Sequence, residues 1–408
     1  MTIRRVPEDF VVEERTTAEF GGSLVPEWSP RGIFAAYRMR KVSLTTPEAT
    51  VRLAKALGVP NGAVEHAGLK DKHAVTHQMV TVRCPTAETA AKLAESVDAG
   101  PVGGVRLGFS PRAAAAEFIE ANRFSIVVRR LQRRDFGSMG QRKSALTEHA
   151  AEPRAPVSLR IVNYFGDQRF GSARHGEGFA ARHLIRGEFE AALKLLIATP
   201  ARKDSGPWRT FTRECAAKWG DWAGLLKVLP RRAERACIEV LAGGGSMKDA
   251  FAALPGFTQQ ICVEAYQSFL WNAAARELAA GLSTKCISAD DDFGEMKFPP
   301  ATAVDADWAA VSMPMLGPGT FLHEPWKPAV LRVLESEGLT LDRLQIPGLR
   351  RPVFGEAARA LFVSATGFSI GEPQPDEYSA GSKLWKRTVS FDLPRGAYAT
   401  VVLRALGQ

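Results

Sequence analysis

Strand-like segments occupy both ends of this chain, and the region between them has the periodicity of helices. Near the amino terminus, residues 10–14 and 124–128 form short runs rich in β-branched and aromatic residues. The same composition returns only near the carboxyl end, at 388–391 and 398–404. A final strand needs a sheet to join, and the amino-terminal strands are the nearest candidates. The pattern therefore predicts one domain built from both chain ends, with the middle of the chain inserted into it.

The length of 408 residues favours two domains, because a single core rarely grows beyond about 250–300 residues. We place the first part of the outer domain at 1–156, the insertion at 157–345 and the final strands of the outer domain at 346–408. Within the insertion, helical periodicity is strongest at 179–196 and 258–280.

Strands and helices alternate through the first part of the chain. Residues 33–37 and 79–83 are further strand candidates. Thr46 is a candidate N-cap and Gly58 a candidate stop for a helix between them, and a second helix is expected at 85–94. The alternation predicts a sheet covered by helices on one side, without deciding between parallel and mixed strand order.

The charge balance favours a polyanionic partner. The formal net charge is +9 and the sequence pI is about 9.4, which suits a nucleic acid or an acidic membrane surface. Basic residues interleaved with aromatic ones suit RNA, whose phosphates attract cations and whose unstacked bases bind flat apolar rings. The clusters are Arg129, Arg130, Arg133 and Arg134; Arg231, Arg232 and Arg235; and Lys383, Lys386 and Arg387 around Trp385.

The cysteines and the amino terminus indicate a cytoplasmic protein. Five scattered cysteines lack the spacing of a zinc site and are expected to be reduced thiols. The basic residues near the start are followed by Pro7, Glu8 and Asp9 rather than by an apolar signal region. No apolar run is long enough to span a bilayer, so no membrane association is expected.

The strongest candidate for chemistry is the segment 68–78, in which Asp71 lies between Lys70 and Lys72. Nearby positive charge favours the ionised carboxylate, and the same lysines favour a phosphate-bearing substrate. Such an aspartate could attack as a nucleophile or accept a proton. The alternative is a solvated connection in which Asp71 caps a turn and the lysines provide solubility.

Other chemistries find little support in the sequence. The seven histidines show no metal-ligand spacing, and neither a Walker loop nor a GxGxxG motif after a strand is present. There is no Gly-x-Ser-x-Gly nucleophile elbow and no glycine-rich loop for S-adenosylmethionine, which disfavours a hydrolase of that class and an RNA methyltransferase. The inventory is consistent with a cofactor-free reaction on RNA.

Six segments in the same order resemble the TruD family of tRNA pseudouridine synthases, and the resemblance runs through nearly the whole chain. They are 7–14, with Arg4 where the family has a basic residue; 67–76, around Asp71; 121–124, with Ala121 in place of glycine; 163–171; 266–272; and 393–400.

The resemblance implies an α+β protein with a pseudouridine-synthase catalytic domain, whose sheet is mixed and largely antiparallel, and an inserted α/β TRUD domain. It implies a cleft for RNA between the two. The expected reaction converts uridine 13, in the D-arm region of tRNA, to pseudouridine with neither a metal nor an organic cofactor. The expected partner is tRNA, and no obligate protein partner is inferred. From the residues themselves, an RNA-binding or RNA-folding protein without catalysis remains the alternative.

The resemblance also implies roles for individual residues. Asp71 is the catalytic residue, with the choice between nucleophile and base left open. Arg4 pairs with Asp71, and without the resemblance a surface cation on the first strand is an equal alternative for it. Phe124 stacks on the flipped uracil, although by periodicity alone it is a core residue. Asn122 orients the loop or contacts the base. The remaining supporting or RNA-binding residues are Glu8, Lys70, Lys72 and Arg169.

Overall fold

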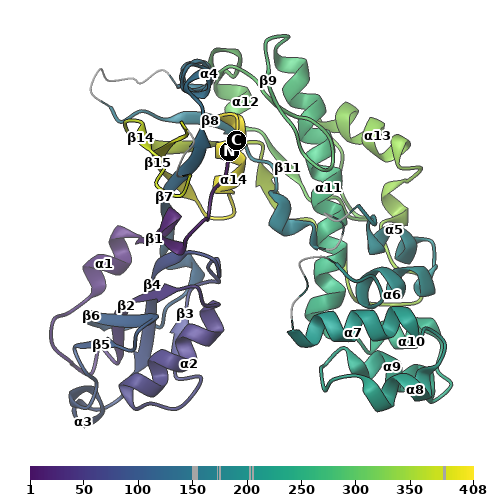
Figure 1. The fold of residues 1–408 in the computed structure, drawn as a ribbon, viewed down its shortest axis with the longest axis horizontal. Helices are drawn as coiled ribbons and strands as arrows, with labels where there is room; N and C mark the ends of the chain where they lie inside the picture. The colour runs from purple at the N-terminus through teal and green to yellow at the C-terminus, as the bar shows by residue number, and fades with distance from the viewer. Residues whose placement is uncertain (149–154, 172, 174–175, 202–203, 205, 380–382) are drawn as a thin grey trace. The chain divides into compact units, whose positions relative to one another are not determined.

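The computed structural model describes the chain except for residues 149–154, 172, 174–175, 202–203, 205 and 380–382 (Figure 1). The chain forms two compact units, Met1–Ile161 with Val363–Gln408, and Val162–Phe362. The domain boundaries expected from the sequence, at 157 and 345, differ from these mainly at the second one, where the chain returns to the first unit. Residues 346–362 belong to the inserted unit because Ile346 and Phe354 are buried there and Gln267 Nε2 donates a 2.8 Å hydrogen bond to the Gly355 carbonyl.

The first unit is built on a mixed sheet in the order β5-β6-β2-β4-β1-β7-β15-β13-β8, with β3 on β4 and β14 on β15. Strands β1 and β4 are parallel, whereas the β1–β7, β7–β15, β2–β4 and β2–β6 pairs are antiparallel. The expected mixed, largely antiparallel sheet is therefore confirmed. The strands are β1 Phe10–Thr16, β2 Phe34–Val42, β3 Val64–His66, β4 Val75–Arg83, β5 Ser96–Asp98, β6 Val102–Ser110, β7 Ile119–Leu131, β8 Leu159–Val162, β13 Phe362–Ile370, β14 Gln374–Pro375 and β15 Trp385–Pro394.

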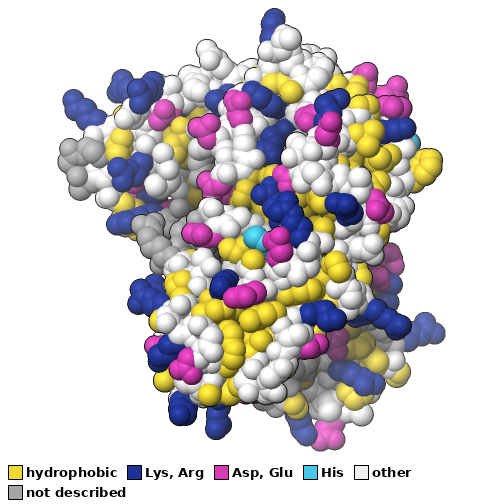
Figure 2. Space-filling view, turned by 90° about the vertical axis from the view of Figure 1, so that its right-hand side faces the viewer, with side chains coloured by type: hydrophobic (Ala, Val, Ile, Leu, Met, Phe, Trp, Pro, Cys, Tyr) yellow, Lys and Arg dark blue, Asp and Glu magenta, His cyan; other side chains and the backbone are white. Residues whose placement is uncertain are grey.

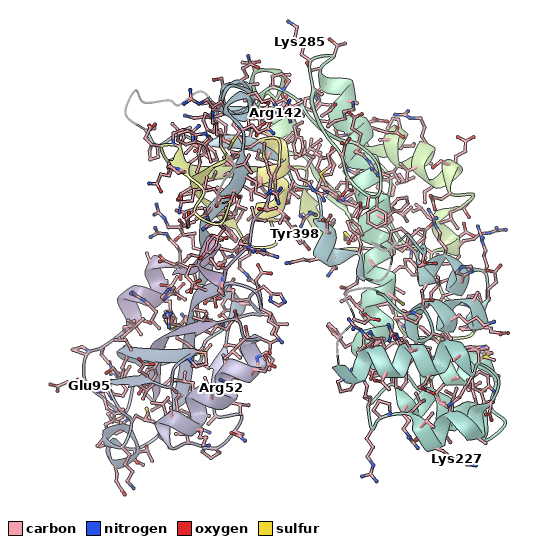
Figure 3. All side chains as sticks on the ribbon, in the orientation of Figure 1. Arg52, Glu95, Arg142, Lys227, Lys285 and Tyr398 are labelled. Carbon is pink, nitrogen blue, oxygen red and sulfur yellow. The ribbon has the colours of Figure 1, made fainter. Side chains whose placement is uncertain are left out.

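The carboxyl end completes this sheet through β15, in which Phe391 pairs with Phe124 of β7. The predicted strand at 398–404 is wrong, because this segment forms helix α14, Ala399–Ala405, which begins just after Tyr398 (Figure 3). Both Val401 and Val402 are buried, together with most of the helix. A short, continuously apolar run fits a buried helix as well as a buried strand, and tertiary burial decided the outcome.

Helices cover both faces of the sheet, contrary to the expectation of one covered side. Tyr37 of β2 packs in one core cluster with Leu53 of helix α2, Thr46–Leu57. The next residue towards the amino terminus, Ala36, packs in another cluster with Phe20 of helix α1, Ala18–Ser23. Successive strand residues point to opposite faces, so these two clusters lie on opposite sides of the sheet. The unit also contains α3 Ala87–Ala91 and α4 Arg133–Leu146.

Helix α2 begins one residue earlier than expected. Thr45, not Thr46, is the N-cap: its Oγ1 accepts the Glu48 amide at 3.3 Å, and the Glu48 carboxylate accepts the Thr45 amide at 2.8 Å. This capping box leaves the Thr46 side chain free to point inward, where it is buried. Gly58 ends the helix as predicted, at a φ of +69° that favours glycine.

The inserted unit is mainly helical, with the 27-residue α11 packed against α5 and α13 (Figure 1). The predicted helix at 258–280 is confirmed as α11, whereas that at 179–196 is two helices, because Gly187 at φ +74° interrupts it. On the surface that faces the viewer in Figure 2, Lys and Arg side chains are interspersed with Asp and Glu. The elements are α5 Ala180–Ile185, α6 Phe189–Ile197, α7 Gly206–Ala217, α8 Trp222–Val228, α9 Arg235–Ala242, α10 Met247–Ala252, α11 Gly256–Leu282, α12 Ala306–Ala310, α13 Lys327–Ser336, and the paired strands β9 Ile287–Ala289 with β10 Met296–Phe298 and β11 Ser312–Pro314 with β12 Ala358–Ala360.

Candidate active site

The Asp71 loop, residues 67–74, connects β3 to β4 and is held to the sheet by buried side chains. Thr46 Oγ1 accepts the Lys70 amide at 3.0 Å, and Gln78 Nε2 donates to the Gly68 carbonyl at 3.3 Å. Lys41 Nζ donates to the main-chain carbonyl of Asp71 itself at 2.6 Å. Buried polar groups of this kind fix a backbone because they have few other partners. The loop is therefore an anchored element of the fold rather than a solvated connection.

Lys41 is the residue of this site that sequence reasoning missed. Its side chain is fully buried on β2, and Nζ also donates to the Leu44 carbonyl at 2.9 Å. Burial lowers the pKa of Lys41 to about 8, and attraction to Asp71 opposes that shift. Its position on the buried face of a strand otherwise lined by apolar residues gave no signal in the sequence.

The Asp71 carboxylate forms an ion pair with Arg4, whose Nη2 lies 3.3 Å from Oδ2. Both side chains are 24% exposed, so the carboxylate remains accessible to a substrate. The Arg4 guanidinium also lies over the Phe10 ring, with 4.0 Å between its carbon and the ring centroid. The predicted partnership of Arg4 and Asp71 is thus present in the structure.

Asp9, rather than Glu8, holds the segment that carries Arg4. The Asp9 carboxylate accepts the amides of Arg5 at 2.9 Å and Val6 at 3.2 Å. It is also paired with the buried Arg129, whose Nη2 lies 2.8 Å from Oδ1. Glu8 is exposed on the short 3-10 turn Pro7–Asp9. The acidic pair in the opening motif therefore divides into an exposed residue and a structural one.

The two lysines that flank Asp71 in sequence contact other carboxylates. Lys70 Nζ lies 2.7 Å from Glu14 Oε1 and donates to Asn122 Oδ1 at 2.7 Å. Lys72 is half-exposed, and its Nζ lies 4.0 Å from Glu48. Adjacent residues of an extended segment point in different directions, so the two lysines that flank Asp71 in sequence do not pair with its carboxylate in the contacts described.

Phe124 and Asn122 lie on the sheet face that the Asp71 loop covers. The register pairs Phe124 with Val12 and Asn122 with Glu14, which places all four on one face. The Phe124 ring is 8% exposed and packs between Phe10 and Phe391, at centroid distances of 6.1 and 5.6 Å. Its present environment is that of a core aromatic residue next to the loop, and Asn122 links the loop to β7 through Lys70.

Arg169 belongs to the inserted unit and is bound to α11. Its Nη2 lies 2.8 Å from Glu264 Oε2, and its Nε donates to Ser268 Oγ at 3.1 Å. The neighbouring Tyr164, Phe165 and Phe170 are buried, as expected for core residues.

The basic clusters of the sequence separate into structural and exposed residues. Arg129 is buried between Asp9, Asp376 and Glu377, and the hydrogen bonds that it donates to these carboxylates raise its pKa. Arg130 is exposed. In the inserted unit, Arg235 is bound to Glu239 and donates to two main-chain carbonyls. Clustering in sequence therefore overstated the number of cations free to meet RNA.

Two further properties concern only the described parts of the chain. There, no group of three or more His, Cys, Asp and Glu side chains is arranged to hold a metal ion. None of the helices that the structure describes is both long enough and apolar enough to cross a membrane.

A mixed sheet that anchors an arginine-paired aspartate in the loop before β4 is the arrangement that the resemblance to the TruD family predicts. Comparison with known proteins gives the family. The family model of tRNA pseudouridine synthase D (TruD) matches residues 1–406, so the chain belongs to the TruD family and is an isomerase that acts as a tRNA pseudouridine synthase.

Individual relatives extend over nearly the whole chain. The tRNA pseudouridine synthase D of Aquifex aeolicus is 28% identical over 99% of this chain and 97% of its own. A probable tRNA pseudouridine synthase D of Pyrobaculum aerophilum is 31% identical over 98% of this chain and 91% of its own. A crystal structure of a putative tRNA pseudouridine synthase D from Methanosarcina mazei has a TM-score of 0.69 at 23% identity, covering 99% of this chain and 92% of that one, which shows a shared fold.

Proposed function

We propose that this enzyme isomerises uridine 13 in the D-arm region of tRNA and that Asp71 is its catalytic carboxylate. The observation that carries the proposal is the anchoring of Asp71: its main chain is held by buried Lys41, while its carboxylate is paired with Arg4 and remains partly exposed. A carboxylate that is held in position and accessible is what a nucleophile or a general base requires.

The reaction breaks the bond between ribose C1′ and uracil N1, turns the base and joins C1′ to C5. A base stacked in RNA cannot turn, so the target nucleotide is flipped out, at a cost of a few kcal/mol. Asp71 then adds to C1′ or removes the 2′ proton. Arg4 pairs with the carboxylate and holds it in place. Phe124 provides an aromatic ring on the covered face, and Asn122 holds the loop through Lys70.

The decisive experiment compares Asp71→Asn with wild type on an unmodified tRNA transcript. Asp71→Asn is expected to bind the transcript normally and to form no pseudouridine, measured by site-specific mapping at position 13. Asp98→Asn is the matched control, because Asp98 is an exposed carboxylate on β5 that accepts only a local amide among the contacts described, from Gly100. Turnover by Asp71→Asn would remove Asp71 from the mechanism. Pseudouridine at another position would keep the enzyme class and change the target.

A further inference from the structure

A cavity of about 300 Å³ lies beside Arg4 in the first unit. It is lined by the amino-terminal segment of the chain and by residues that follow β14. Arg4 therefore both lines this cavity and pairs with Asp71. Four arginines and one aspartate are among its lining residues, which favours an anionic ligand. The lining is Thr2, Ile3, Arg4, Arg5, Arg129, Arg130, Asp376, Tyr378 and Ser379.

The wall of the cavity is a built structure rather than a chance group of surface side chains. Arg129 is buried and paired with Asp376 at 2.9 Å. The Asp376 carboxylate in turn accepts the Arg130 amide at 3.2 Å and the Ser379 hydroxyl at 2.9 Å. Asp376 is thus occupied by its neighbours. Arg129 and Arg4 are paired with carboxylates, so the positive charge that the cavity presents to a ligand comes from the exposed Arg5 and Arg130.

Two of the lining arginines have unusual backbone conformations. Arg4 has a φ of +65° and Arg130 a φ of +59°, and among the described residues Ser43 is the only other non-glycine residue in that region. Left-handed backbone at a residue other than glycine is strained and concentrates at ligand sites. Of these two arginines, Arg4 pairs with Asp71, while the side chain of Arg130 is exposed.

Tyr378 gives the cavity an aromatic surface. Its side chain is 51% exposed, and the Arg129 guanidinium carbon lies 4.6 Å from the ring centroid. The guanidinium of a buried arginine thus supports one face of the ring and limits its motion. A ring held from behind and open to solvent suits the stacking of an unpaired base.

We propose that this cavity binds a nucleotide of the RNA that neighbours the target uridine, with its phosphate at Arg5 and Arg130 and its base on Tyr378. The proposal rests on the proposed function, because Arg4 connects the cavity to Asp71. Arginines recognise phosphate oxygens, and stacking on tyrosine accepts any base, so the cavity contributes affinity and strand direction rather than sequence specificity.

The test measures binding of an unmodified tRNA transcript in the Asp71→Asn background, which keeps the substrate unconverted. Tyr378→Ala is expected to raise Kd about five- to tenfold, since one stacked base is lost, whereas Tyr378→Phe keeps the ring and the affinity. Arg130→Ala is expected to reduce the slope of log K against log salt by about 0.7 to 0.9. Arg52→Ala, which removes an exposed arginine from α2, is the matched control and leaves both quantities unchanged (Figure 3).

In the active enzyme, Tyr378→Ala is expected to raise KM with kcat unchanged at saturating tRNA, a result that separates this cavity from the chemistry of Asp71. A Kd of Tyr378→Ala within twofold of that of its parent overturns the proposal. The proposal is also overturned if Arg52→Ala reduces the salt slope as much as Arg130→Ala does. UMP is the second probe. Tight binding of UMP alone that Tyr378→Ala abolishes would assign the cavity to a free nucleotide and overturn the RNA assignment.

Discussion

Two aspartates of the same unit, Asp9 and Asp71, are each paired with an arginine but have opposite surroundings. Asp9 is buried, and it binds Arg129 and two main-chain amides. Asp71 is partly exposed and is paired with Arg4 at a longer distance of 3.3 Å. A fully satisfied buried carboxylate stabilises the fold, because removing it leaves its partners unpaired. A carboxylate that is anchored through its main chain and still accessible is available for chemistry.

The largest expected effects come from exchanging each aspartate for asparagine. Asp71→Asn should lower turnover by about 10³-fold or more and change the free energy of unfolding by less than about 1 kcal/mol, since its ion pair is partly solvated. Asp9→Asn should cost about 4 kcal/mol of stability, because Arg129 loses one of its two buried carboxylate partners and the amides of Arg5 and Val6 lose their charged acceptor. Denaturant unfolding and single-turnover assays measure the two quantities. Equal loss of stability in both variants would refute the contrast.

The flanking lysines extend the comparison. Lys70→Met removes the partner of Glu14, whose side chain is 1% exposed, and should cost about 3 kcal/mol because an unpaired carboxylate is left buried. Lys72→Met removes a half-exposed cation and should change stability by less than about 0.5 kcal/mol. Parallel urea titrations check both variants, and a stable Lys70→Met would show that the Lys70–Glu14 contact adds nothing to the fold.

Lys41 connects the Asp71 loop to pH. Its pKa is about 8 in the folded protein and 10.5 as the ordinary value, so the unfolded chain binds more protons between these values. The stability of the wild type should therefore rise with pH across this window, by about 2 kcal/mol between pH 7 and 10 relative to Lys41→Met. Unfolding curves of both proteins at the two pH values provide the measurement. If the unfolding free energies of the wild type and of Lys41→Met changed equally between the two pH values, Lys41 would have its ordinary pKa in the folded protein.

The smallest effect is expected at Glu8, the neighbour of Asp9. Glu8→Gln should change stability by less than about 0.5 kcal/mol and turnover by less than about twofold, because its side chain is exposed. Thermal unfolding and the pseudouridine assay test this together. A marked loss of turnover with an unchanged melting temperature would instead give Glu8 a direct role towards RNA.

Local patterns predicted much of the site and missed the residues that support it. Asp71 was visible because charged residues beside a glycine interrupt an otherwise strand-like segment. Lys41 and Asp9 were not, since each acts on a segment to which the sheet brings it, and Lys41 lies 30 residues from its carbonyl partner. The arginine clusters failed as a guide for the same reason: Asp376 is 247 residues from Arg129.

The amino-acid sequence by itself determined strands β1, β2, β4, β7 and β15 of the first unit, the long helix α11, the basic character and the aspartate loop, because these depend on composition and on spacing between neighbours. Only the tertiary structure decided that 398–404 is a helix, that Arg129 is structural while Arg130 is exposed, and that a buried lysine holds the Asp71 main chain. Burial and pairing depend on which distant segments meet, and strand register rather than local propensity sets those meetings.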